Sequence, residues 1–201
     1  MKRSKTISLI LFLVLLIVML TVWQANCPLQ GVAFSSKMRL LVSLKNRTTT
    51  PGEEDFDRQV TLTALLQPGD DRERWSDTRA ATVEGYVVEV GAGGVEAANC
   101  YSLTRRDTHI HVALRPDVLP QERVVVEVTP GMANWAKGRG LDWSEAALRR
   151  ELLGRWCRFE GWLLFDVQHA DESENTAPGK GGNWRATAWE VHPVTRLEVL
   201  R

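Results

Sequence analysis

The sequence predicts a mostly β protein: a five-stranded Greek-key barrel with one helix between its third and fourth strands, preceded by an N-terminal membrane helix. Two observations predict this fold class. Alternating apolar and polar residues, typical of strands with one buried face, recur from about residue 81 to the end of the chain and are interrupted by one strong helix signal. A basic leader followed by an apolar run opens the sequence.

Composition indicates an ordinary globular protein. The chain has 201 residues, and its 25 Lys and Arg residues balance 25 Asp and Glu residues, so the formal net charge is zero. Apolar residues make up 44% and charged residues 25%, which excludes a wholly disordered or collagen-like chain. Neutrality also argues against a protein that holds nucleic acid mainly by bulk charge.

Residues 1–27 are predicted to be a signal peptide or a signal anchor. Three basic residues lie within Met1–Lys5, and residues 7–23 are almost entirely apolar. This pattern predicts a membrane contact through residues 7–23, with cleavage and retention both open. It places the protein in the bacterial cell envelope, anchored or secreted, with the C-terminal domain outside the cytoplasm. Residues 28–80 are predicted to be a linker with a short docking segment.

Residues 81–201 form the predicted barrel domain, whose first three strands precede a helix. Residues 81–90 alternate and contain Gly85, which permits a bend. Residues 108–114 alternate as well, and residues 124–129 form a third strand that stops at Pro130-Gly131. Each segment therefore predicts a strand.

The second half of this domain predicts one helix and two further strands. Residues 144–153 have apolar side chains at helical spacing, with Ser144 as the N-cap and a glycine directly after the last turn. Residues 156–167 predict the fourth strand. Residues 184–199 predict the fifth, after a polar loop rich in glycine.

Five strands with a helix between the third and fourth is the element order of the OB-fold, a small Greek-key barrel. The motifs DTHIHVAL, VVVEVTP, GWLLFDVQH and NWRATAWEVHPV, with this element order, resemble a group of uncharacterised exported bacterial OB-like proteins. The resemblance covers about three-fifths of the chain and implies no particular activity. OB-folds as a class bind oligonucleotides, oligosaccharides or proteins, so the fold alone does not decide the function.

Histidines and carboxylates near the strand ends are the candidate metal ligands. His109 and His111 alternate on one strand and therefore share a face, with Asp107 before them. Such a pair presents two imidazoles to one ion, and His192 with Glu190 on the last strand could complete a divalent metal site. The alternative is that Asp107, His109 and His111 form the solvated face of a strand, and no cofactor is present.

Tryptophan is unusually frequent, with eight residues against two tyrosines. Exposed tryptophans on a barrel face stack on sugar rings or bases, whereas buried ones only pack. Trp184 and Trp189 fall on opposite faces of the predicted last strand, so one of them should be accessible. The candidate ligand-binding residues are therefore Trp162, Trp184, Arg185, Trp189 and Glu190.

Three cysteines are too few for a disulfide-dense scaffold. Cys157 opens the predicted fourth strand, and Cys100 follows the first strand, which is its antiparallel neighbour in an OB barrel. A Cys100–Cys157 disulfide is geometrically possible, and two buried thiols are the alternative. Cys27 has no evident partner.

The sequence favours a non-enzymatic binding module of the cell envelope whose ligand is a protein or a glycan. It contains none of the common hydrolase, phosphate-binding or dinucleotide-binding motifs. A metal-dependent hydrolase using His109 and His111 is the alternative. Binding of single-stranded nucleic acid is the third possibility and is disfavoured, because residues 82–201 contain 14 basic and 17 acidic side chains.

Overall fold

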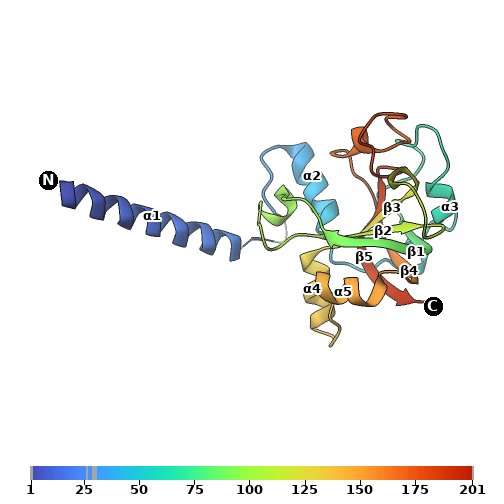
Figure 1. Cartoon of the computed structure of the whole chain (residues 1–201). Coiled ribbons are helices and arrows are strands. Elements are labelled where there is room, and N and C mark those ends of the chain that lie inside the picture. The colour runs from blue at the N-terminus through green and yellow to red at the C-terminus, as the bar shows by residue number, and fades with distance from the viewer. Residues whose placement is uncertain (1, 26, 29–30, 201) are drawn as a thin grey trace.

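Five strands close into a barrel in the computed structural model, which describes residues 2–25, 27–28 and 31–200 (Figure 1). The strands are β1 (Ala80–Ala92), β2 (Thr108–Ala113), β3 (Val124–Val128), β4 (Trp156–Phe165) and β5 (Trp189–Val199). They follow one another around the barrel in the order β1-β2-β3-β5-β4. Neighbours are antiparallel except β3 and β5, which are parallel. The predicted five-stranded barrel is confirmed, and its strand order is compatible with an OB-like barrel.

The length of β1 allows one strand to serve both halves of the barrel. Residues 80–86 pair with β4 and residues 86–92 pair with β2, with a break in the register between Val87 and Glu89. Alternate residues of β1 are buried, as the sequence pattern predicts. The hydrophobic core is filled mainly by aliphatic residues together with a few aromatic ones, among them Val83, Val112, Val126, Phe159 and Leu163.

Two helices lie between β3 and β4. The predicted helix is present as α5 (Glu145–Leu152), and the Ser144 side chain accepts a hydrogen bond from the Ala147 amide as its N-cap. The preceding helix α4 (Pro130–Lys137) was not predicted, because Pro130-Gly131 indicated only the end of a strand. Thr129 caps α4, and Pro130 occupies its first turn, where a missing amide hydrogen costs nothing.

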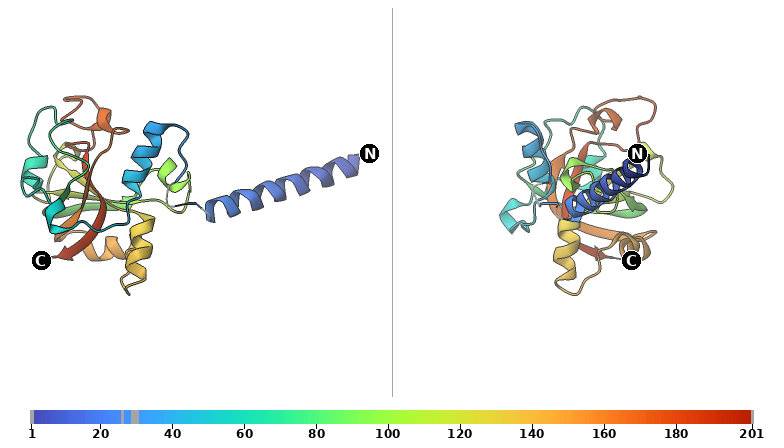
Figure 2. Two further views of the ribbon diagram at one scale, coloured as in Figure 1. Left: turned by 180° about the vertical axis from the view of Figure 1, so that it is seen from behind. Right: turned by 90° about the vertical axis from the view of Figure 1, so that its left-hand side faces the viewer.

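The segment between α1 and β1 packs against the barrel. It contains helices α2 (Ser36–Lys45) and α3 (Leu62–Leu65), and residues Val60, Leu62 and Leu65 join the barrel core. Figure 2 shows α2 beside the barrel in both views. Four short 3-10 helices complete the fold: η1 (Glu53–Asp55), η2 (Ala97–Asn99), η3 (Pro120–Glu122) and η4 (Ala170–Glu172).

Helix α1 (Lys2–Ala25) projects away from the barrel (Figures 1 and 2). Its apolar side chains, such as Leu11 and Leu15, are exposed. Within the part of the chain that the structure describes, no helix has both the length and the hydropathy needed to cross a bilayer. This finding corrects the predicted membrane helix at residues 7–23.

The disulfide joins Cys27 to Cys100, with 5.7 Å between their Cα atoms, and not Cys100 to Cys157. Cys157 is a buried free thiol on β4, and burial raises its pKa to about 11. The predicted pairing was wrong because Cys100 lies beyond the end of β1, whereas Cys157 pairs in register with Gly85 near the middle of that strand.

We expect Gly161→Ala to destabilise the barrel by about 1–3 kcal/mol, the usual cost of overpacking. A Cβ atom at residue 161 would lie 2.2 Å from the Pro193 carbonyl oxygen, where β4 and β5 approach closely. Gly181→Ala is the matched control, since a Cβ atom there meets nothing within 4 Å. Urea unfolding of both variants measures the difference, and equal stabilities would contradict the prediction.

Candidate functional site

A cleft of about 560 Å³ opens on the barrel between the β1–β2 loop and the β4–β5 loop. We call it the histidine cleft and define it by its polar and aromatic walls: Glu89, His109, His111, Arg123, His169, Glu172 and Trp184. Strands β1 and β2 supply its floor, and the two loops supply its rims. Residues from distant parts of the sequence therefore meet at one surface.

His109 and His111 reach the cleft together because alternate residues of β2 point to the same side. Gly93, on the β1–β2 loop, leaves the space that the His109 ring occupies. A Cβ atom at residue 93 would lie 2.4 Å from His109 Nε2. The loop glycine thus permits the close approach of the two chain segments.

Trp184 brings the β4–β5 loop onto these imidazoles. The centroid of its ring lies 6.3 Å from that of His109, in a stacked arrangement, 5.6 Å from that of His111 and 5.7 Å from that of His169. The indole Nε1 donates a hydrogen bond of 2.5 Å to Glu172, within the same loop. One half-buried indole therefore contacts all three histidines of the cleft.

A cluster of charged side chains lies buried within the domain and contacts the cleft residues His109 and His169. We call it the buried ionic cluster; its members, each no more than 2% exposed, are Lys45, Asp107, Glu127, Asp166, Arg185, Glu190 and His192. Burying a charge is costly unless it is paired, so these groups must neutralise one another or bind something that does.

Arg185 and Glu190 form the central pair of the buried ionic cluster. The Arg185 guanidinium donates to Glu190 Oε1 and to Ser173 Oγ, and it lies 3.7 Å from Asp166. The other oxygen of Glu190 accepts a hydrogen bond of 3.1 Å from His192 Nδ1. Glu190 therefore links the guanidinium to the imidazole.

Glu127 connects the buried ionic cluster to the histidine cleft. Its Oε1 lies 3.1 Å from His109 Nε2, and its Oε2 lies 3.2 Å from His192 Nδ1. Asp107, the residue directly before β2, has its Oδ2 atom 3.9 Å from His192 Nε2. Asp107, Glu127 and His192 each offer a ligand atom, and these three atoms lie within 4.8 Å of one another.

Lys45 enters the cluster from α2, far away in sequence. Its Nζ lies 2.5 Å from Glu96 and 3.7 Å from Asp166. Asp166 also accepts a 2.6 Å hydrogen bond from His169 Nδ1. A lysine outside the barrel strands thus compensates carboxylates at the barrel end.

The environment separates the pKa values of the two β2 histidines. Burial alone would lower the pKa of His109, but the neighbouring Glu127 carboxylate raises it to about 9. Burial lowers the pKa of His111 to about 4, because its carboxylate neighbour, Glu89, compensates too little. Around pH 7 the cleft therefore holds one cationic and one neutral imidazole side by side.

The surroundings shift the pKa values of the cluster's carboxylates in different directions. Burial raises the pKa of Asp107 to about 6, against the attraction of His192. Burial would also raise the pKa of Asp166 and Glu190, but Asp166 is held below its usual range by His169, Lys45 and Arg185, and Glu190 by Arg185 and His192. Asp107 is therefore the least compensated acid of the three.

The structure distributes the predicted metal ligands over two places. Asp107 and His192 meet in the buried ionic cluster beside Glu190, whereas His109 and His111 line the cleft. His109 remains connected to the cluster through Glu127. The four predicted ligands do not form a single site around the histidine pair of β2.

Of the predicted ligand-binding residues, Trp184 lines the cleft, while Arg185 and Glu190 lie buried beside it. Trp184 precedes β5 and belongs to the loop, not to the strand as predicted. Trp189 is buried, and its Nε1 donates to the Asp71 carbonyl. Trp162 lies elsewhere, donating to the Thr49 carbonyl beside Arg47.

The sequence reasoning missed Lys45 and Glu96 as members of the site. Lys45 ends an amphipathic helix in a segment predicted to be a linker, and no local pattern marks it as buried. Glu127 carried a usable signal, because a carboxylate inside an apolar strand needs a buried cation. Its partners in the structure are His109 and His192.

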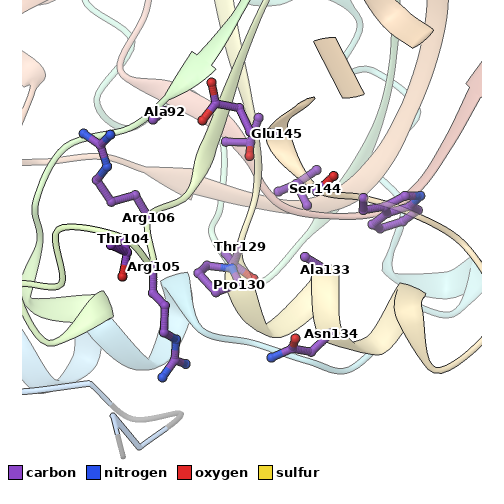
Figure 3. Close-up of a pocket in the computed structure, with 13 residues that line it drawn as sticks. Ala92, Thr104, Arg105, Arg106, Thr129, Pro130, Ala133, Asn134, Ser144 and Glu145 are labelled. Carbon is purple, nitrogen blue, oxygen red and sulfur yellow. The ribbon is translucent and has the colours of Figure 1, made fainter. Parts of the chain in front are cut away.

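A second pocket, of about 380 Å³, lies between the β1–β2 loop and helices α4 and α5 (Figure 3). Arg105, Arg106, Asn134 and Glu145 are among its polar lining residues. The guanidinium groups of the two arginines point in opposite directions in Figure 3. The two guanidinium groups therefore do not converge on one position where a compact anion could bind both. None of the predicted site residues lines this pocket.

The fold and the site define a class of protein: a closed five-stranded barrel with an open histidine cleft above a buried ionic cluster. No protein-family model matches the chain, and no curated protein matches its sequence. The functional inference therefore rests on the geometry of the site.

We expect His169→Gln to destabilise the protein more at about pH 6 than at about pH 9. The hydrogen bond to Asp166 raises the pKa of His169 above its ordinary 6.5. The charged imidazole therefore stabilises the folded state below that ordinary pKa, and the contribution disappears as pH rises through the raised value. Urea unfolding at both pH values measures this, with Gln168→Ala as the neighbouring control. Equal destabilisation at the two pH values would contradict it.

Proposed function

We propose that the protein is a glycan-binding domain with an OB-like barrel that holds an oligosaccharide in the histidine cleft. One observation carries the proposal. The cleft lies over β2, between the loop that joins β1 to β2 and the loop that joins β4 to β5. OB-type barrels bind their ligands at this place, on the face of strands 2 and 3 and between these two loops.

The groups in the cleft suit a polar, uncharged ring. His111 is neutral around pH 7, and its Nδ1 has no hydrogen-bond partner among the described residues. Glu89 and Arg123 on the same wall pair with each other at 2.9 Å and offer both acceptor and donor atoms. The Trp184 indole adds an apolar surface of the kind that packs on sugar rings.

Charge favours a glycan over single-stranded nucleic acid. The cleft contains two carboxylates, Glu89 and Glu172, beside Arg123 and two imidazoles with raised pKa values, His109 and His169. A sequence-independent single-strand site needs a basic groove that follows the phosphates. The barrel segment, residues 82–201, has three more acidic than basic side chains, which argues in the same direction.

The Cys27–Cys100 disulfide supports a location outside the cytoplasm. Such bonds persist in oxidising compartments and are rare where cellular thiols keep cysteines reduced. Envelope and extracellular glycans are the ligands available in such a compartment. We therefore propose that the domain acts at the cell envelope or beyond it.

A glycan array probed with the full chain tests this function, followed by calorimetric titration with any glycan retained. We expect Trp184→Ala to weaken binding by about tenfold or more, since one aromatic contact contributes on the order of 1–3 kcal/mol. Trp135→Ala is the matched control, because Trp135 lies on α4, outside the cleft, where Arg139 packs on its ring.

Retention of a glycan by the wild type and the Trp135 variant, but not by the Trp184 variant, would support the proposal. A blank array would overturn it. Salt-dependent binding of single-stranded oligonucleotides through Trp184 would also overturn it, in favour of nucleic-acid recognition.

A further inference from the structure

We propose that Asp107, Glu127 and His192 bind a divalent transition-metal ion beneath the histidine cleft. This inference goes beyond the proposed glycan binding and does not depend on it. One carboxylate oxygen from each acid and one imidazole nitrogen lie within 4.8 Å of one another. Ligands placed about 2.0–2.2 Å from a zinc ion would be roughly 3.5 Å apart, so only a small contraction is needed.

The ligand atoms lack hydrogen bonds. Neither carboxylate oxygen of Asp107 has a hydrogen-bond partner within the described part of the chain, and the same holds for His192 Nε2 and for Glu127 Oε2, which makes an ion-pair contact of 3.2 Å with His192 Nδ1. All three residues are at least 98% buried. Buried polar atoms are normally hydrogen-bonded, because leaving them unpaired costs free energy, so a set of four requires an explanation. A bound cation would satisfy all four.

The surroundings of His192 prepare its Nε2 for a metal. His192 Nδ1 donates to Glu190, and Arg185 holds the other oxygen of Glu190. When the ring carries one proton, this arrangement places it on Nδ1 and leaves a lone pair on Nε2, on the side where Asp107 lies 3.9 Å away. Metal-bound histidines in proteins are typically oriented in this way, by a carboxylate that accepts the proton of the other ring nitrogen.

Glu127 is oriented in a similar way from the cleft side. His109 Nε2 lies 3.1 Å from Oε1, and Oε2 faces His192, 3.2 Å from its Nδ1 and without a hydrogen bond. Glu127 and His192 lie on the paired strands β3 and β5, and Asp107 directly precedes β2, which also pairs with β3. A site on paired strands is held more firmly than one on loops.

Charge balance points to a cation as well. Five carboxylates meet around the cluster, namely Glu96, Asp107, Glu127, Asp166 and Glu190, against two permanently charged bases, Lys45 and Arg185. Protons on the histidines are one way to supply the missing positive charge. A divalent ion is the other, and it also accounts for the four atoms without hydrogen bonds.

The donor set selects the class of metal. One imidazole nitrogen with two carboxylate oxygens suits Zn²⁺ or Mn²⁺, whereas Mg²⁺ and Ca²⁺ prefer oxygen ligands throughout. Three protein ligands leave a fourth position for water, as in zinc sites that are not purely structural.

The test uses the full chain, produced without a histidine tag, stripped with EDTA and titrated with Zn²⁺ and with Mn²⁺ alone. We expect elemental analysis after gel filtration to find one equivalent of one of these metals. Asp107→Asn and Glu127→Gln should each lower its affinity by on the order of 100-fold, because a neutral amide replaces a charged carboxylate ligand. Asp70→Asn is the matched control, because Asp70 is exposed and pairs with Arg72.

A second measurement covers the case in which the cluster variants do not fold. Nitrogen-15 spectra of wild-type histidine side chains should show the bound metal at His192 Nε2, with His111 and His169 unchanged. Substoichiometric metal would overturn the proposal, as would a metal signal at His111 or His169, or unchanged affinity in a folded Asp107→Asn variant. Glycan binding is measured on the array and metal binding by elemental analysis, so a negative result for one proposal does not decide the other.

Discussion

The site depends on the hydrogen bonds and ion pair that the buried Arg185 guanidinium makes with its neighbours. The guanidinium is fully buried, donates to Glu190 on β5 and to Ser173 in the β4–β5 loop, and lies against the Trp184 ring. Taking a guanidinium out of water is favourable only if these partners are in place. The loop must therefore close onto the barrel end, and this closure places Trp184 in the histidine cleft and encloses the carboxylates of the buried ionic cluster.

The sequence contains enough information for the barrel because strands and helices with one buried face have a local signature. Val83 and Val87 alternate within β1, and Leu148 and Leu152 repeat at helical spacing in α5, so the elements can be found without knowing their neighbours. Helix α4 has no such clear period, and Pro130 marks a helix start as well as a strand end. The partner of Cys100 lay outside the predicted barrel, so strand order within it could not identify Cys27.

The sequence indicates which residue types belong to the candidate site, but it does not indicate which of them meet in space. His109, His111, Asp107 and His192 are recognisable as ligand types near strand ends, but the pairing of Asp107 with His192 depends on how β2, β3 and β5 close around the barrel. Lys45 comes from an amphipathic helix, and only tertiary packing makes it a partner of Glu96. The periodicity of a sequence indicates on which face of a strand or helix a residue lies. It does not indicate which charged residue from a distant part of the sequence packs against that face.

His109 joins the two proposed sites, because its ring forms a wall of the cleft while its Nε2 contacts a proposed metal ligand, Glu127. An ion bound to Glu127 Oε2 would change the charge that His109 faces through Oε1. A ligand that turned the His109 ring in the cleft would remove one contact that orients Glu127. Any such effect must be mutual, since coupling between two binding sites changes both affinities by the same factor. Gly93 sets how far the ring can turn, because it leaves the space beside Nε2 that a larger residue would fill.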